Sequence, residues 1–445
     1  MYKIIYKNVI FPTMEFIKGT SIQRYLRWLN KTQWLNSNEL EEIQNKKLRA
    51  LVKHAYENVP YYHRIFRDLN LKPDDIKSKE DLQKIPVLTK EIIRKNFSDL
   101  IAVNTPRSRF IETQSSGSTG EPLRFFVDKK AYSHGWAQTF RCWSWAGFSI
   151  GDPYVKIGAK PRTTFLKKLQ DRLMNCLYVP REDIFNACDY WINRIKNKHP
   201  KIVRGFPSYI YFLAKVVNDT SVEINPNAVM TTGEMLIPQH RDTIENAFNC
   251  KVFDCYGGEA TPIAFECELH ESYHICDEIV IVEVVKGNET ADVGEIVITN
   301  LDNYVMPFIR YRIQDLGRMG DGVCSCGRGL SLLDSIEGRT GSVVLTPSGK
   351  VLFPLFFTDL FRDLDGVDQF QIIQNKIDKI KIKIVKNEKF TYDELRYIVS
   401  KLRSVDSELE VIVEFVDGIH PLNSGKIAII VSRFSIEDVW RFLDG

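Results

Sequence analysis

The sequence predicts an α/β protein with a large N-terminal domain of layered α/β subdomains and a small, mobile α+β domain at its C-terminal end. Short apolar segments alternate with helical segments between residues 202 and 259, a pattern typical of α/β layers. Residues 379–384 alternate strictly between lysine and isoleucine, which predicts an amphipathic strand. The chain has 445 residues, more than one hydrophobic core usually serves, so we expect at least two domains.

Charge and cysteine content exclude several functional classes. Lysine and arginine number 60 and aspartate and glutamate 57, so the chain lacks the positive excess typical of nucleic-acid-binding proteins. We find no apolar run of about 18 to 20 residues and no secretory signal, and therefore expect a cytoplasmic protein. Nine cysteines, an odd number scattered along the chain, are typical of reduced cytosolic thiols, some of which serve as metal ligands.

The first 110 residues are expected to be mainly helical. The first twenty combine apolar residues with lysines, which suits either packing onto the protein's own body, the alternative we favour, or peripheral contact with the inner face of a membrane. From Asn38 the apolar residues recur at helical spacing, with Glu41 placed for a cap, until Val59 and Pro60 end the helix.

A serine- and glycine-rich stretch at residues 114–123 reads Gln-Ser-Ser-Gly-Ser-Thr-Gly-Glu-Pro-Leu. Such a stretch suits neither a helix interior nor a packed strand, and it offers hydroxyl and amide groups that suit phosphate oxygens. A polar surface hairpin is the alternative. Residues 123–127 are apolar and β-prone, so we expect the loop to join two strands.

Three apolar strands are each followed by a turn with glycine. They lie in residues 202–209, 229–234 and 251–259, and the first leads through Pro207 and Ser208 into a helix. Because ligands of open α/β sheets bind at the carboxyl ends of the strands, we expect the functional site there.

Two further segments between the loop and these strands bear on the substrate. The aromatic residues of 136–148 are expected to be mainly core, although Trp136 is assigned to the substrate pocket. Residues 156–162 form a basic loop with glycine and proline; if this loop faces the substrate, the substrate is polar or anionic, and a solvated loop is the alternative.

These motifs carry a family resemblance. Residues 115–122 closely resemble the phosphate-binding loop of the adenylate-forming (acyl-AMP) ligase superfamily. Residues 59–62, 72–76 and 85–90 resemble the phenylacetate–coenzyme A ligase family, especially its capsular polysaccharide biosynthesis (CapK-type) branch. Nearly the whole chain is covered, with six motifs in the family's order. The resemblance implies a large domain at residues 1–338 and a small lid domain at residues 339–445.

The resemblance also implies roles for individual residues. Tyr256 would stack on adenine, Gly233 and Glu234 would line the adenine wall, and Glu259 would bind the Mg²⁺ that bridges the phosphates. The remaining expected ATP-binding residues are Ser115, Ser116, Gly117, Ser118, Thr119, Gly120 and Gly257. The residues expected against the acid substrate are Trp136, Gly205, Pro207 and Ser208. The Tyr-Gly motif is one residue shorter than usual, and a capping or ion-paired glutamate is the alternative for Glu259.

Three later positions complete this expected site. Residues 306–315 resemble the segment whose final aspartate accepts both ribose hydroxyls, a role that falls to Asp315, although Gln314 replaces the usual glycine. Arg339 would contact ribose or phosphates at the hinge, where Gly341 replaces the usual aspartate. Residues 421–426 resemble the catalytic-lysine signature, so Lys426 would stabilise the charge that builds up when a carboxylate attacks the α-phosphate.

A structural metal site is a further expectation. Cys267, His270, His274 and Cys276 lie close together in sequence, Cys324 and Cys326 add two thiols, and relatives use a comparable set. Three cysteines and one histidine suit structural Zn²⁺. We assign Cys267, His274, Cys324 and Cys326, with plain reduced cysteines as the alternative. Four protein ligands leave no open position, so the metal would not be catalytic.

The implied activity is an ATP-dependent ligase that converts a small carboxylic acid to an acyl-adenylate. The acyl acceptor would be the thiol of coenzyme A, or an amine or sugar group in capsular or surface polysaccharide assembly. The basic loop at 156–162 replaces the glycine-rich segment typical of phenylacetate ligases and argues against phenylacetate. The departures at Glu121, Gln314 and Gly341 and the shortened Tyr-Gly motif leave open a catalytically degenerate binding protein in a polysaccharide assembly complex. A different nucleotide enzyme, such as a kinase-like transferase, is a second alternative.

Overall fold

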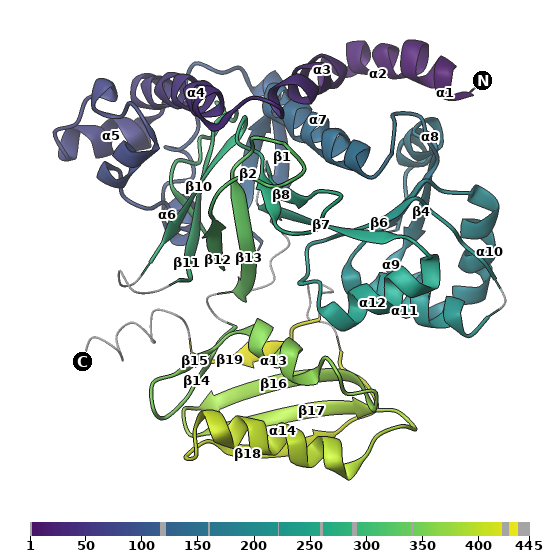
Figure 1. Ribbon diagram of the computed structural model, residues 1–445. Helices are drawn as coiled ribbons and strands as arrows, with labels where there is room; N and C mark the ends of the chain where they lie inside the picture. The colour runs from purple at the N-terminus through teal and green to yellow at the C-terminus, as the bar shows by residue number, and fades with distance from the viewer. Residues whose placement is uncertain are drawn as a thin grey trace.

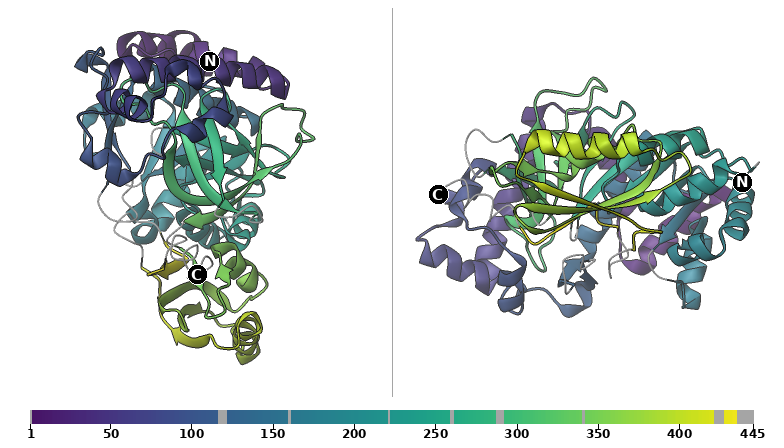
Figure 2. Two further views of the ribbon diagram at one scale, coloured as in Figure 1. Left: turned by 90° about the vertical axis from the view of Figure 1, so that its left-hand side faces the viewer. Right: turned by 90° about the horizontal axis from the view of Figure 1, so that it is seen from below.

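The computed structural model describes residues 2–115, 122–158, 161–220, 222–258, 261–286, 292–339, 342–420 and 427–434. These residues form a large body around an eleven-stranded sheet and a small unit around a four-stranded sheet. Figure 1 shows the small unit below the large body, and Figure 2 shows the arrangement from two further directions. The α/β fold class predicted from the sequence is confirmed.

The N-terminal part is helical. Its elements are α1 (Tyr2–Ile5), the π-helix η1 (Tyr6–Ile10), α2 (Phe11–Lys18), α3 (Ile22–Thr32), α4 (Ser37–Asn58), α5 (Pro60–Asp68), the 3-10 helices η2 (Pro73–Asp75) and η3 (Lys79–Lys84), α6 (Lys90–Lys95) and the 3-10 helix η4 (Arg107–Arg109). Tyr6 and Phe11 are buried, and the Phe11 ring packs edge-on against Phe140 with centroids 6.1 Å apart. One face of the first helices therefore docks onto the body.

The start of α4 differs from the sequence prediction. The capping box is formed by Asn36 and Glu39, two residues before the expected pair Asn38 and Glu41. The Asn36 side chain accepts from the Glu39 amide at 3.0 Å, and the Glu39 carboxylate accepts from the Asn36 amide at 3.0 Å. The helix ends at Asn58, and Pro60 begins α5, so the predicted stop is confirmed.

The serine- and glycine-rich stretch follows the first strand of a hairpin. Strands β1 (Phe110–Gln114) and β2 (Arg124–Asp128) pair antiparallel. The amide of Ser115 donates to the Leu123 carbonyl at 2.8 Å, and the Leu123 amide donates to Ser115 Oγ at 2.9 Å. The prediction that the loop joins two strands is confirmed.

The large sheet runs in the order β10-β11-β12-β13-β9-β8-β7-β6-β5-β3-β4. Its strands are β3 (Tyr154–Gly158), β4 (Cys176–Pro180), β5 (Ile202–Gly205), β6 (Ala228–Thr232), β7 (Lys251–Gly258), β8 (Thr261–Glu266), β9 (Tyr273–Ile275), β10 (Val280–Val285), β11 (Gly294–Asn300), β12 (Tyr311–Gly320) and β13 (Leu332–Arg339). At one end of the sheet, the neighbouring strands β4, β3, β5, β6 and β7 pair in parallel. In the rest of the sheet, which runs β7-β8-β9-β13-β12-β11-β10, neighbouring strands are antiparallel. The sheet therefore changes from parallel to antiparallel pairing at β7.

Helices cover both faces of the parallel half. They are α7 (Lys129–Trp145), α8 (Phe165–Leu173), α9 (Arg181–Asn186), α10 (Cys188–Lys198), α11 (Pro207–Asn218) and α12 (Pro238–Phe248). Val203 and its neighbours on one face pack with α10, α11 and α12, whereas Ile202 and Ala228 on the other face belong to the core that contains Phe140 and Trp143 of α7. Because side chains alternate along a strand, these two cores lie on opposite faces.

The small unit contains β14 (Val344–Leu345), β15 (Val351–Leu352), α13 (Pro354–Phe361), β16 (Val367–Lys376), β17 (Lys379–Lys386), α14 (Tyr392–Val405), β18 (Glu410–Phe415) and β19 (Ile430–Ser432). Its main sheet has the order β18-β17-β16-β19. The alternation predicted for β17 is confirmed, because Ile380, Ile382 and Ile384 are fully buried. None of the helices in the described ranges is long and apolar enough to cross a bilayer.

Candidate functional site

A cavity of about 660 Å³ lies between the large body and the small unit. This volume is in the range of small-molecule sites. Seven residues expected from the sequence at a nucleotide or acid site line it, namely Ser208, Gly233, Glu234, Tyr256, Gly257, Asp315 and Arg339. They come from α11, the turn after β6, β7, β12 and β13, and residues 427–432 of the small unit complete the wall. The carboxyl ends of β6 and β7 thus meet the small unit at this cavity.

Asp315 is held between two neighbours. Tyr256 Oη donates to Asp315 Oδ2 at 2.9 Å, and Arg339 Nε lies 3.5 Å from Asp315 Oδ1. The aspartate and the arginine are register partners on β12 and β13, so strand pairing itself brings them together. Each carboxylate oxygen has further acceptor capacity, which allows Asp315 to accept hydroxyl donors from a ligand.

Glu234 connects the two parts of the molecule. Its Oε2 accepts from the Ser208 amide at 3.2 Å, and its Oε1 accepts from the Ile427 amide at 3.4 Å. Ser208 lies in the first turn of α11, where helix amides have no partner within the helix, so a carboxylate is well placed there. The Ile427 contact brings a backbone amide of the small unit to the cavity.

Gly233 has a conformation that few other residues adopt. Its φ is +83°, and a Cβ built on it would lie 2.8 Å from the Phe206 ring. Both the backbone angle and the close approach of Phe206 therefore require glycine at this turn.

Gln314 keeps the backbone shape expected of the glycine it replaces. Its φ is +74°, in the left-handed region, and its Oε1 accepts from Lys90 Nζ at 3.2 Å. The substitution has therefore not moved the backbone next to Asp315 out of a glycine-like conformation.

The other predicted site residues are distributed as follows. Within the described ranges, Trp136, Gly205 and Pro207 are not among the residues that line this cavity. Trp136 packs on Phe140 of the same helix with ring centroids 5.7 Å apart. Ser115 lies at the neck of the β1–β2 hairpin. The remaining predicted site residues lie outside the described residues, as do the departures at Glu121 and Gly341; they are Ser116, Gly117, Ser118, Thr119, Gly120, Glu259 and Lys426.

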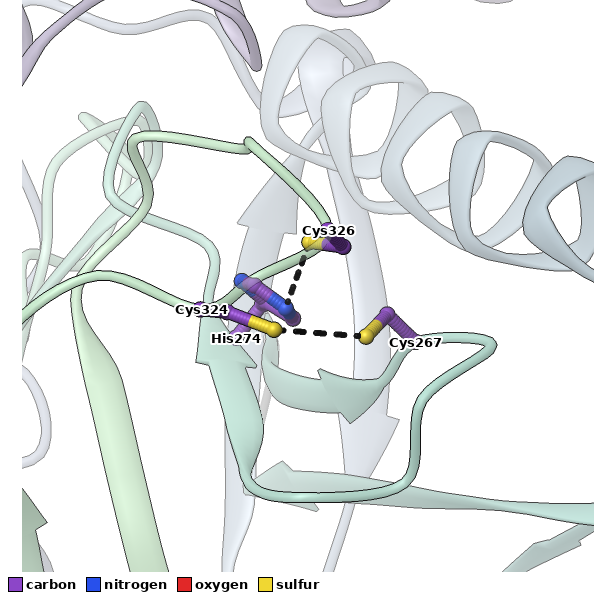
Figure 3. Close-up of side chains that lie close together, drawn as sticks. All are labelled: Cys267, His274, Cys324 and Cys326. Atoms are coloured by element: carbon purple, nitrogen blue, oxygen red, sulfur yellow. Dashed lines mark hydrogen bonds between the residues drawn. The ribbon is translucent and has the colours of Figure 1, made fainter.

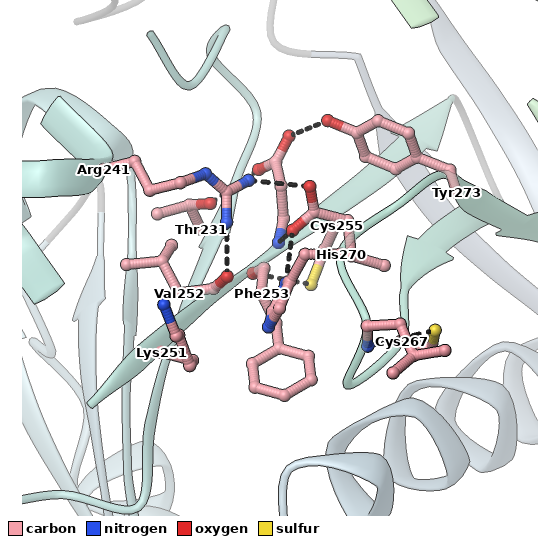
Figure 4. Close-up of polar contacts among 12 residues, drawn as sticks. Thr231, Arg241, Lys251, Val252, Phe253, Cys255, Cys267, His270 and Tyr273 are labelled. Carbon is pink, nitrogen blue, oxygen red and sulfur yellow. Dashed lines mark hydrogen bonds and ion pairs between the residues drawn. The ribbon is translucent and has the colours of Figure 1, made fainter. Parts of the chain in front are cut away.

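The cavity wall also contains a buried polar network that the sequence analysis missed (Figure 4). Asp254 of β7 accepts from Thr231 Oγ1 at 2.6 Å and from Tyr273 Oη at 2.8 Å. Its own amide donates to Glu266 at 2.8 Å, and Arg241 donates to the other Glu266 oxygen at 2.7 Å. Burial, reinforced by the Glu266 charge, raises the pKa of Asp254 to about 6. An aspartate inside an otherwise apolar strand was the available signal.

A second cluster lies apart from the cavity. The ligand atoms of Cys267, His274, Cys324 and Cys326 all lie within 4.8 Å of one another (Figure 3). Cys267 Sγ is 3.8 Å from Cys324 Sγ, and Cys326 Sγ is 3.5 Å from His274 Nε2. The Leu269 amide donates to Cys267 Sγ at 3.5 Å. Four such atoms converging on one point fit a tetrahedral Zn²⁺, and they are the four residues assigned from the sequence.

Comparison with known protein families and sequences gives a consistent picture. Residues 344–433 match the CapK C-terminal domain family. The chain is 23% identical to protein CapK of Staphylococcus aureus over 86% of each chain. It is 27% identical to phenylacetate–coenzyme A ligase of Pseudomonas putida over 71% of this chain and 74% of that enzyme.

Solved structures agree with these sequence relationships. The fold matches that of 2-hydroxyisobutyryl-CoA ligase in the postadenylation state with a TM-score of 0.72, at 18% identity and 93% coverage of both chains. The TM-score is 0.60 against the same ligase in the thioesterification state, at 93% coverage of both chains. Residues 344–433 thus belong to the CapK C-terminal domain family, the chain over most of its length is similar to protein CapK and to phenylacetate–coenzyme A ligases, and its fold is that of an adenylate-forming ligase.

Proposed function

We propose that this chain is an ATP-dependent ligase that activates a carboxylic acid as an acyl-adenylate and then passes the acyl group to an acceptor. The observation that supports the proposal most is the convergence of Glu234, Tyr256, Asp315 and Arg339 on one cavity closed by the small unit. In this proposal Asp315 accepts the ribose hydroxyls, Arg339 faces ribose or phosphate oxygens, and Tyr256 packs on the adenine.

Residues outside the described ranges complete the proposed chemistry. The serine- and glycine-rich stretch 116–120 would bind phosphate oxygens, and Glu259 would bind Mg²⁺ with them. Lys426, which precedes Ile427, would stabilise the negative charge that builds on the α-phosphate as the carboxylate attacks and pyrophosphate leaves.

Pyrophosphate exchange over a panel of acids tests the activity. The proposal expects exchange with at least one acid, AMP as the nucleotide product, and loss of exchange in Lys426→Ala with the fold intact. ADP in place of AMP would indicate the kinase-like alternative. ATP binding without exchange for any acid would indicate the degenerate ligase alternative.

The acceptor is proposed to be coenzyme A, or an amine or sugar group of a surface polysaccharide precursor. The relationship to phenylacetate–coenzyme A ligases supports the first, and the CapK relationship supports the second. Once an acid is known, the acyl-adenylate is offered coenzyme A and amino sugars in parallel, and mass spectrometry identifies the product that forms.

The small domain is proposed to comprise residues 339–445 and to rotate between the two half-reactions. The higher TM-score against the postadenylation state than against the thioesterification state supports an arrangement here that suits the first half-reaction. Rotation would then allow the acceptor to reach the adenylate.

The four-residue cluster is proposed to bind one structural Zn²⁺. Its ligands come from the segment after β8, from β9 and from the loop between β12 and β13, so the ion would tie these segments together. Metal analysis of the purified protein should give about one zinc per chain, and Cys326→Ser should lose it. Cys188→Ser, in α10, is the matched control and should keep it. Zinc-free protein of unchanged thermal stability would contradict this assignment.

The N-terminal surface is proposed to contact a membrane that contains anionic lipids. Phe16 and Ile17 of α2 are 88% and 77% exposed, and Phe165 and Leu166 of α8 are 76% and 75% exposed. Figure 1 shows α8 near α1, and Tyr2 Oη donates to the Leu173 carbonyl at 2.7 Å. Large exposed apolar side chains of this kind mark interaction sites.

The charges beside these side chains favour anionic lipid as the partner. The basic residues of α1, η1, α2 and α8 are Lys3, Lys7, Lys18, Lys167, Lys168 and Arg172, of which Lys3 pairs with Asp152 at 2.7 Å. The acids of the same elements are Glu15, which accepts from backbone amides, and Asp171, which pairs with Arg162. Sedimentation with phosphatidylglycerol vesicles but not with phosphatidylcholine vesicles is expected, and Phe16→Glu should abolish it. Self-association at Phe16 without vesicle binding would contradict the proposal.

A further inference from the structure

Two basic side chains lie next to each other on the parallel half of the large sheet. Lys156 of β3 and Arg204 of β5 are register partners, and Tyr178 of β4 is the partner of Lys156 on its other side. Aligned residues of neighbouring parallel strands point to the same face. The Arg204 guanidinium lies 5.4 Å from the ring centroid of Trp143, so this is the face covered by α7.

Neither cation has a directly bonded counter-ion among the described residues, and the charge of Asp171 acts on Lys156 less strongly than the opposing charges of Arg204 and Arg162. Among the described residues, Lys156 Nζ and the Arg204 guanidinium take part in no hydrogen bond or ion pair. The neighbouring Arg162, by contrast, donates to both oxygens of Asp171 at 2.8 and 3.2 Å. Burial, with the nearby charges of Arg204 and Arg162, lowers the pKa of Lys156 to about 8.

An unpaired pair of like charges in a partly buried place costs folding free energy. Both side chains are only partly exposed, and each repels the other. Such an arrangement is sustained where a bound anion supplies the missing charge, because an ionised partner forms the strong, charge-assisted bonds.

Lys156 and Arg204 lie near the proposed active-site cavity. Arg204 precedes Gly205 at the carboxyl end of β5, and Ser208, which lines the cavity and donates to Glu234, lies four residues later. Arg204, with Lys156 beside it on β3, therefore lies at the strand end that leads into the cavity wall, although neither cation is among the residues that line the cavity itself.

We propose that Lys156 and Arg204 bind a second anionic group of the acid substrate, so that the enzyme activates acids carrying a further carboxylate or phosphate. This inference rests on the proposed function. The reacting carboxylate would remain at the nucleotide, and the second anion would determine which acid is accepted. A neutral hydrocarbon tail would leave both cations unpaired, which disfavours simple monocarboxylic acids such as phenylacetate.

Matched pairs of acids test the inference in the pyrophosphate exchange assay. Glutarate is compared with valerate, 4-carboxyphenylacetate with phenylacetate, and 3-phosphonopropionate with butyrate. The wild-type enzyme should prefer the dianionic member of a pair by about 100-fold in kcat/KM. Lys156→Met and Arg204→Met should remove most of that preference while leaving the KM for ATP unchanged. Lys201→Met, at the amino end of β5, is the matched control and should behave as wild type.

A ligand-free measurement separates this inference from the proposed function. Removing an unpaired, partly buried charge should raise the thermal midpoint of Lys156→Met, whereas a purely structural lysine would give a lower midpoint. Glutarate or inorganic phosphate, without ATP, should stabilise wild type more than Lys156→Met.

The outcomes are distinct. If the enzyme catalyses exchange only with monocarboxylic acids, and neither substitution changes the rate, the proposed anion site is wrong but the proposed ligase activity stands. If anions raise the thermal midpoint of the wild type but no acid supports pyrophosphate exchange, the anion site is supported and the proposed ligase activity is wrong. A raised KM for ATP in both variants would assign the cations to the nucleotide and overturn the inference.

Discussion

The orientation of the Asp315 side chain depends on two neighbouring side chains. Tyr256 donates to one of its oxygens, and Arg339 lies beside the other. Glycine-like backbone at Gln314 keeps the strand shape at this point. The carboxylate is thereby already oriented, which would reduce the entropy lost if it binds the proposed ribose.

Replacing Asp315 tests its proposed role directly. Asp315→Ala should weaken ATP binding by about 1.5 to 3 kcal/mol, the scale of a charge-assisted hydrogen bond, or about 10- to 150-fold in Kd. Isothermal titration measures the change. Asp321→Ala removes an exposed carboxylate beyond the end of the same strand and should have no effect. An unchanged affinity in Asp315→Ala would refute the role.

Gly233 offers a second test at the level of one residue. Gly233→Ala should lower the free energy of unfolding by about 2 to 4 kcal/mol, because alanine meets both the left-handed backbone and the Phe206 ring. Gly257→Ala is the control: its φ is not in the left-handed range, and the nearest atom to an added Cβ is 3.8 Å away. Urea unfolding of both variants without ligand compares them. Equal losses would contradict the explanation.

Among the elements, α4 shows how local contacts determine a helix start. Both asparagines 36 and 38 suit a cap by residue type, and both have a glutamate three residues later. In the structure Asn36 and Glu39 make the reciprocal bonds, and Leu40 then falls on the buried face. The burial of that face therefore selects between two locally equivalent caps.

Alanine substitution distinguishes the two caps. Asn36→Ala should lower stability by about 1 kcal/mol, because an amide at the helix start loses its acceptor. Asn38→Ala, on the exposed surface of the same turn, should be close to neutral. The urea midpoints of the two variants give the comparison, and a larger loss for Asn38→Ala would place the cap where the sequence analysis put it.

The Asp254 network joins strands β6, β7, β8 and β9 and predicts a dependence on pH. Because the folded pKa of about 6 exceeds the ordinary value of 3.8, the folded protein keeps a proton that the unfolded chain releases. The protonated Asp254 carboxyl therefore contributes to the free energy of unfolding at low pH, and this contribution is lost as the pH rises from about 4 to about 6. The thermal midpoint of Asp254→Asn, relative to wild type, should rise across this window. A difference that stays constant with pH would exclude Asp254 as the titrating group.

At the scale of the whole molecule, a small number of polar contacts join the small unit to the large body. Lys215 pairs with Asp368 at 2.9 Å, Gln239 donates to the Val367 carbonyl at 3.2 Å, and the Ile427 amide donates to Glu234. Partly exposed contacts of this kind suit the rotation of the small domain that is proposed above, because they would be broken at little cost.

Weakening this contact should change the balance between the two half-reactions. Lys215→Met should slow acyl-adenylate formation by up to about 5-fold, since an exposed ion pair contributes at most about 1 kcal/mol. Acyl transfer from preformed adenylate should not slow. Lys251→Met breaks the Lys251–Glu245 pair inside the large body and is the matched control. Equal effects of both variants on adenylation would argue against the role of the Lys215 contact.

Residue type and spacing are enough to predict many of the helices and strands and the order of the motifs. Alternating isoleucines in β17, the glycine turns after apolar strands and the hairpin around the serine-rich loop all depend on contacts between near neighbours, which residue type and spacing encode. The four residues assigned to Zn²⁺ do lie close together, although two separate segments supply them, because few residue types bind zinc and they stand out in a sequence.

Which groups from distant parts of the chain come into contact depends on how the elements pack together. Asp254 and Glu266 meet Arg241 because three elements pack together, and Lys156 meets Arg204 because β3 and β5 pair although more than forty residues separate them. No local pattern reports such juxtapositions, since the sheet order and the closure of the small unit arise from burying apolar faces across the whole chain. The helices and strands could therefore be predicted from the sequence, whereas the contacts between charged side chains from distant segments could not, because packing determines them.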